Sequence, residues 1–73
     1  MEAFQQRVLD EKNELDERRA KLHDFIQGLS LPEVFPALPL NEQRLMHQQL
    51  AAMNWYSETL ARRLEAWGVL PKA

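Results

Sequence analysis

The 73-residue sequence predicts an all-α protein folded as a long antiparallel two-helix hairpin. Two stretches rich in helix-forming residues, each with apolar side chains at helical spacing, predict the helices. One proline-rich stretch lies between them, so we expect the helices to be neighbours that run in opposite directions. Residues 1–73 are expected to form a single domain. A chain this short has little core of its own, so we expect the hairpin to assemble into a helical bundle oligomer.

The first helix is predicted over residues 2–28. Neither proline nor glycine occurs between Glu2 and Gln27, and strong helix formers dominate. Gly28 supplies a C-terminal stop signal. The apolar positions that repeat at helical spacing are Phe4, Val8, Leu15, Leu22, Phe25 and Ile26.

A connector is predicted over residues 29–38 and a second helix over residues 39–67. The connector is too apolar for a flexible linker, so we expect it to be partly helical and to fold over the end of the hairpin. Pro39 suits the first turn of the second helix, and Gly68 begins a short C-terminal tail, residues 68–73. Met46, Met53, Leu60 and Trp67 follow one another in seven-residue steps along this helix.

Antiparallel pairing of the helices predicts apolar ends and a polar middle. Pairing Ile26 with Leu45 places Phe4 near Trp67, and the row Phe4–Glu11–Arg18–Phe25 then falls at the seam between the helices. Ser57 is expected in the same middle region. We define the polar band as the residues that this register brings together there: Arg7, Glu11, Arg18, Gln49, Tyr56 and Arg63.

Three interpretations of the polar band remain open. Its charges are solvent-exposed pairs of little energetic weight, or they fix the register inside an oligomer, or they bind a ligand. In the third interpretation the arginines Arg7, Arg18 and Arg63 contact phosphate and Tyr56 stacks or donates a hydrogen bond. Glu11 and Gln49 then orient the arginines or contact a base edge. The ligand expected from these groups is anionic and nucleotide-like.

A rival prediction places function on an apolar side face. Leu9, Phe35 and Trp55 lie off the main seam and are the expected anchors for a host protein that the chain inhibits or links.

Composition excludes several other classes of function. There is no cysteine, and His23 and His47 lie far apart, so we predict no metal site and no cofactor. No hydroxyl has a histidine at a helical neighbour position, so no catalytic residues are predicted and the protein is expected not to be an enzyme. A formal charge of −2 argues against binding a nucleic-acid duplex. No apolar run is long enough to cross a membrane and no signal peptide is evident, so a cytoplasmic location is expected.

Two patterns resemble small, mostly uncharacterised proteins encoded by bacteriophages and prophages. They are "F-x-x-R-V-x-x-E-K-x-E-L" at residues 4–15 with "K-L-x-x-F-I" at 21–26, and "L-P-x-x-E-Q-x-L-M-x-x-Q-x-x-A-M-x-x-Y-x-x-x-L-x-x-R" at 38–63. The resemblance implies an anti-defence accessory protein. Some phage proteins of this shape are oligomers that sequester cyclic nucleotide signals, and others block a host protein.

Overall fold

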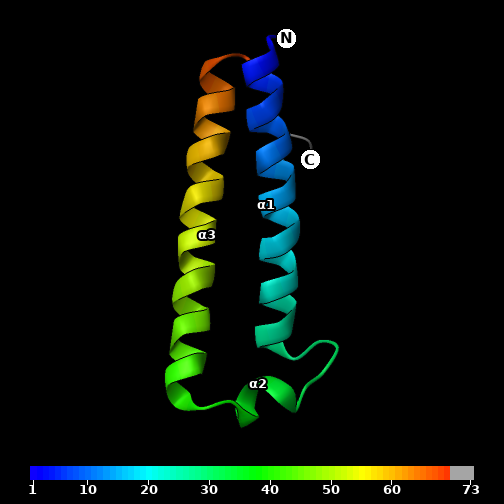
Figure 1. Ribbon diagram of the computed structural model, residues 1–73, viewed down its shortest axis with the longest axis vertical. Helices are drawn as coiled ribbons and strands as arrows, with labels where there is room; N and C mark the ends of the chain where they lie inside the picture. The colour runs from blue at the N-terminus through cyan, green and yellow to red at the C-terminus, as the bar shows by residue number, and fades with distance from the viewer. Residues whose placement is uncertain (70–73) are drawn as a thin grey trace.

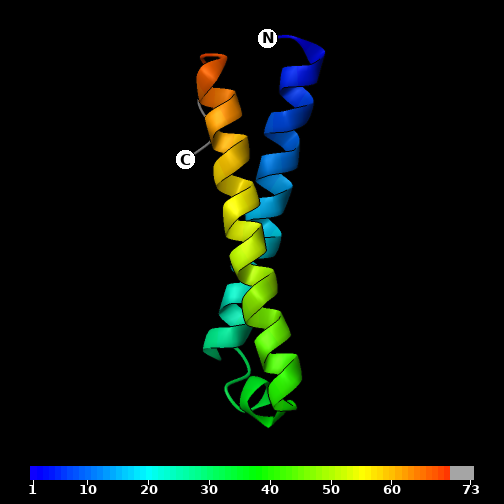
Figure 2. The same ribbon diagram turned by 90° about the vertical axis from the view of Figure 1, so that its left-hand side faces the viewer.

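Two long helices lie side by side and a short helical connector joins them at one end (Figure 1). The computed structural model describes residues 1–69, and these contain α1 (Ala3–Gln27), α2 (Val34–Ala37) and α3 (Leu40–Ala66). The all-α hairpin predicted from the sequence is confirmed. The molecule measures 46 × 21 × 15 Å, and the two helices cross at a shallow angle (Figure 2).

Local hydrogen bonds fix both ends of α1. The backbone N–H of Glu2 donates to the Gln5 side-chain oxygen at 3.0 Å, which satisfies one of the donors that a helix start leaves free. At the other end Gly28 adopts a left-handed conformation with φ of 71°. The N–H of Leu29 then reaches back to the carbonyl of Asp24 at 3.1 Å, a common way to end a helix.

The connector is packed through Phe35, whereas the apolar side chains of Leu29, Leu31 and Val34 are exposed. Phe35 in α2 is buried and makes edge-on contacts with the rings of Phe25 on α1 and His47 on α3. Gln43 donates to the connector carbonyls of Pro36 and Leu38 at 3.2 and 2.8 Å, which ties the first turn of α3 to α2. These contacts close one end of the hairpin.

The apolar core occupies the opposite end and the seam between the long helices. Leu60 and Leu64 on α3 are almost completely buried against Val8 and Leu15 of α1. The side chains packed around this cluster are Leu9, Met53, Trp67 and Val69. Phe4 meets Trp67 with ring centroids 5.3 Å apart, so the predicted register is confirmed at this end.

The seam itself contains a different polar row from the one predicted. Glu11 and Arg18 are exposed, whereas the adjacent Lys12 is buried and Arg19 is half-buried. One residue turns a helix by about 100°, so Glu11 and Arg18 lie outside the seam on a side of the hairpin, although Phe4 of the same row still packs on Trp67. Placing Glu11 and Arg18 between the helices was therefore wrong.

Candidate functional site

A charged cluster joins the two helices at the middle of the hairpin. Lys12 Nζ on α1 donates to Asp16 Oδ2 at 2.6 Å and to Ser57 Oγ of α3 at 3.2 Å. The Ser57 hydroxyl donates in turn to Asp16 Oδ1 at 2.5 Å. All three groups are thus satisfied within a mostly buried site, with the Lys12 side chain only 11% exposed. Ser57 was correctly expected in this region, but Lys12 and Asp16 were missed.

Asp16 also faces a second cation. The guanidinium nitrogen Nη2 of Arg19 lies 3.4 Å from Asp16 Oδ1. Burial raises the pKa of the Asp16 carboxyl, but hydrogen bonds from Lys12 and Ser57 and the charges of Lys12 and Arg19 outweigh it and lower that pKa below its usual 3.8. Asp16 is therefore ionised at neutral pH. With two cations on one carboxylate, the cluster carries a net charge of +1.

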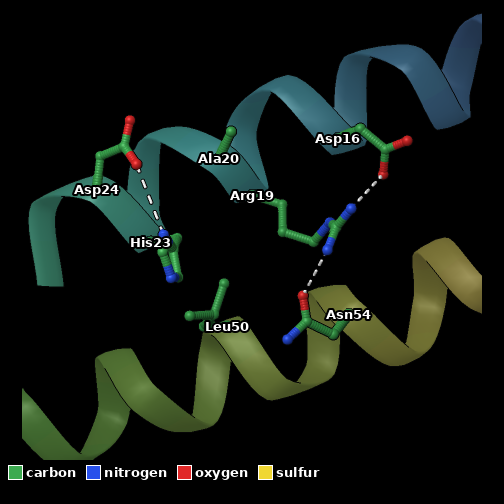
Figure 3. A pocket seen from close by; sticks show the side chains of 7 residues that line it. All are labelled: Asp16, Arg19, Ala20, His23, Asp24, Leu50 and Asn54. Carbon is green, nitrogen blue, oxygen red and sulfur yellow. Dashed lines mark hydrogen bonds and ion pairs between the residues drawn. The ribbon is translucent and has the colours of Figure 1, made fainter. Parts of the chain in front are cut away.

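Arg19 bridges the helices at the rim of an open groove (Figure 3). Its Nη1 donates to the Asn54 side-chain oxygen on α3 at 3.0 Å. Asp16 and Asn54 hold the guanidinium from two sides, which fixes its plane. The groove has a volume of about 340 Å³, and its lining residues are Asp16, Arg19, Ala20, His23, Asp24, Leu50 and Asn54.

One donor of Arg19 is left over. The Nε atom is buried and makes no hydrogen bond within residues 1–69. Buried polar atoms without partners are rare in folded proteins, because they lose their water without compensation. Because this atom is shielded from solvent, an acceptor from outside could reach it only if the Arg19 side chain moved.

The side chains of the polar band lie on the opposite broad face of the hairpin. In Figure 1 the N-terminus is at the top and α1 lies to the right of α3. Figure 3 draws α1 above α3 with its N-terminal side at the right, so turning that view until the N-terminal side is at the top places α1 to the left of α3. The two figures therefore view opposite faces, and the groove is on the face turned away in Figure 1. Helical spacing places the polar-band residues on the other flank of the seam. All six are exposed: Arg7, Glu11, Arg18, Gln49, Tyr56 and Arg63.

Two arginines of the polar band contact side chains outside it. Arg63 lies over the Trp67 ring at 5.3 Å, and Arg18 approaches Glu14 at 3.9 Å in an exposed pair. The six side chains share a face, and none of them lines the groove beside Arg19. Their role in ligand binding remains a prediction.

The three expected partner anchors have different environments. Trp55 is 66% exposed on α3 and is available for contact. Leu9 is half-buried against the core cluster, and Phe35 is buried between Phe25 and His47. In this conformation Phe35 holds the connector in place and is not accessible as a surface anchor.

The described residues hold no cluster of three or more side chains suited to a metal ion. No described helix is both long enough and apolar enough to cross a lipid bilayer.

Comparison with known proteins adds one decisive finding. A family model described as Sequestin matches residues 2–66, which include both long helices and the connector. The chain belongs to the Sequestin family. The family name is compatible with a sequestering function. No curated protein and no solved structure matches the chain.

Proposed function

We propose that the protein is a non-enzymatic, self-associating sequestering protein that binds an anionic, nucleotide-like ligand. The observation that carries the proposal is the pair of cations, Lys12 and Arg19, on a single carboxylate, Asp16, beside an open groove. The resemblance to phage proteins favours an anti-defence role, in which the ligand is a signal of the infected cell.

The excess positive charge of the Lys12–Asp16–Arg19 cluster is confined to the Arg19 end of the groove, because Asp24 also lines the groove and adds a second carboxylate. Anion binding is therefore expected at Arg19. Taking a cation out of water is costly unless an opposite charge compensates it. Asp16 compensates one of the two cations, and a bound phosphate group would compensate the other. The fixed guanidinium of Arg19 presents planar donors to such a group at the rim of the groove.

The groove also suits the uncharged part of a nucleotide. Its 340 Å³ falls at the small end of the range of about 300–1,000 Å³ that is typical of small-molecule sites. Leu50 and Ala20 provide apolar wall, and His23 and Asn54 provide polar groups for a sugar or a base edge. If the phosphate of a nucleotide binds at Arg19, its base would lie along the apolar wall formed by Leu50 and Ala20.

The polar band is the alternative ligand site, with Arg7, Arg18 and Arg63 as phosphate contacts and Tyr56, Glu11 and Gln49 around the base. The rival function is binding of a host protein through the exposed Trp55. Each alternative depends on a different residue, so variants of Arg19, Arg18 and Trp55 distinguish the groove, the polar band and binding of a host protein.

The test begins with native mass spectrometry of protein purified gently from cells, to detect a bound nucleotide and release it by denaturation. AMP, cyclic AMP and inorganic phosphate are then titrated by calorimetry into wild type, Arg19→Gln and Arg18→Gln. Arg18 is the matched control, because it is adjacent in sequence but faces the other side. We expect Arg19→Gln to weaken binding roughly 10- to 100-fold, as for loss of a charged hydrogen bond. Arg18→Gln should bind as wild type does.

The reverse result, with binding lost only in Arg18→Gln, moves the site to the polar band. A protein that carries no nucleotide and binds none of the three probes contradicts the proposal. Loss of a captured host protein in Trp55→Ala would then favour the rival function. Circular dichroism of each variant, with Asn54→Ala as a second groove variant, shows whether a loss of binding reflects unfolding.

A further inference from the structure

One row of side chains on α1 is complementary to itself when reversed. Phe4, Glu11, Arg18 and Phe25 occur at exact seven-residue intervals, which places them along one stripe of the helix. Read from either end, the order is aromatic, charged, charged of opposite sign, aromatic. The two charges of the stripe lie on the face opposite the groove, where the Arg18 side chain is 72% exposed. At its ends Phe4 is 47% exposed beside Trp67, and Phe25 is half-buried against Phe35.

We propose that this face is the interface of a two-fold homodimer in which each long helix packs antiparallel against its counterpart. The two-fold axis passes between α1 and its counterpart, level with the stretch between Glu14 and Leu15, the midpoint of the stripe. It sets Glu11 against the partner's Arg18 and Phe4 against the partner's Phe25. This pairing rests on the self-association in the proposed function and specifies its geometry.

A second row, on α3, leads to the same axis independently. Gln49, Tyr56 and Arg63 are also spaced by seven residues and lie on the same face. A two-fold axis through Tyr56 pairs Gln49 with the partner's Arg63, an amide oxygen with a guanidinium, and brings the two Tyr56 side chains together.

The two axes coincide within the hairpin. Ser57 on α3 is hydrogen-bonded to both Lys12 and Asp16 on α1, so it lies level with the stretch between them. That stretch contains the midpoint of the α1 row, and Tyr56 is adjacent to Ser57. One axis therefore serves both helices, although the two rows were identified separately.

Size and surface chemistry also fit a second copy. The broad face of the hairpin measures 46 × 21 Å, on the order of the ~800 Å² per partner that a standard stable interface buries. The exposed flank of α3 that would meet its counterpart has small or uncharged side chains, which allow close approach, at Leu45, Ala52, Thr59 and Ala66. A groove remains open on each outer face of the dimer.

Within a single hairpin, Glu11 and Arg18 make few stabilising contacts. Glu11 makes no ion pair within residues 1–69, and the Arg18–Glu14 pair is long and exposed. In the dimer both charges form ion pairs with the partner and fix the register of the two helices. Buried ion pairs commonly specify register in this way, although they add little stability. The outer row of Arg7, Glu14 and Lys21 is not complementary in this pairing, but it lies at the solvent rim, where charges are screened.

Charge reversal tests the pairing directly, with molar mass measured by light scattering after gel filtration. Glu11→Arg and Arg18→Glu each place like charges opposite each other, and we expect at least a tenfold weaker dimer. The double variant Glu11→Arg/Arg18→Glu restores opposite charges and should recover the wild-type dimer. Positions 11 and 18 are two helical turns apart in one chain, so this rescue requires a partner.

Cross-linking supplies a second measurement, because the wild-type chain has no cysteine. Tyr56→Cys sits on the axis and should form a disulfide dimer upon mild oxidation, whereas Glu58→Cys on the outer side should remain monomeric on a non-reducing gel. A wild-type monomer would refute both this dimer and the proposed self-association. An oligomer insensitive to the charge reversals would refute this interface alone, and nucleotide uptake by Arg18→Glu would show that the groove still functions.

Discussion

Ser57 on α3 donates a hydrogen bond to Asp16 on α1 at the centre of the hairpin, and Lys12 bridges the same two side chains. The apolar core cluster lies on one side of this contact, and the connector lies on the other. A polar link at this point fixes the sliding position of one helix against the other, which an apolar seam alone specifies weakly.

Removing the Asp16 carboxylate is expected to destabilise the fold. Asp16→Asn leaves Lys12 buried beside Arg19 with no anion, and unpaired buried charges are costly. Because the Asp16 side chain is 30% exposed, part of this cost is screened, and we expect a loss of about 2 kcal/mol in the free energy of unfolding. Urea denaturation measures it. Glu17→Gln is the exposed control and should stay within about 0.5 kcal/mol of wild type, and an equal loss in both variants would contradict the role given to the cluster.

The same carboxylate predicts a pH dependence. Its pKa is lowered in the folded protein, so the unfolded chain binds more protons in the acid range and stability rises with pH there. The contribution of Asp16 is fully present above its unfolded value near 3.8 and is lost as pH falls through the lower folded pKa. Urea midpoints compared between about pH 6 and about pH 3 should therefore fall more in wild type than in Asp16→Asn. Parallel curves for the two proteins would show that Asp16 is not linked to acid unfolding.

Leu64 is the most buried side chain of the core and offers a direct measure of its strength. Leu64→Ala removes buried methyl groups and leaves a cavity against Val8 and Leu15, so we expect a cost of about 3 kcal/mol. Thermal unfolding at a fixed protein concentration detects it, because self-association would otherwise shift the midpoint. Leu40→Ala, at a position 76% exposed, is the matched control and should leave the midpoint nearly unchanged.

Helix boundaries and pairing were predictable because their signals are local or repeat along the chain. Gly28 ends α1 and the prolines confine the connector, whereas matched apolar ends set the register that brings Phe4 to Trp67. The polar middle was also predictable, since the seven-residue rows lose their apolar character there.

The identity of the seam residues was not predictable in the same way. Both candidate rows are polar, Glu11 with Arg18 and Lys12 with Arg19, so hydrophobic spacing cannot choose between them. The choice depends on Asp16, which lies one turn from Lys12 and meets Ser57 from the other helix. A lysine stem packs against apolar neighbours while its ammonium finds a carboxylate, and that preference appears only once both helices are placed. The Lys12–Asp16 spacing was the one available signal, and it is common on exposed helices.

Two glycines allow the contact of the connector with α1 to be measured separately from backbone conformation. Gly28 and Gly68 have nearly equal positive φ values, 71° and 73°, so replacing either with alanine carries a similar conformational cost of about 1 kcal/mol. A Cβ at position 28 would lie 3.0 Å from the Cα of Pro32, whereas a Cβ at position 68 would meet nothing within 4 Å. Gly28→Ala should therefore lower the free energy of unfolding by about 1 kcal/mol more than Gly68→Ala. Equal losses by urea denaturation would mean that the connector moves aside freely, and its packing through Phe35 would then contribute little to closing the hairpin.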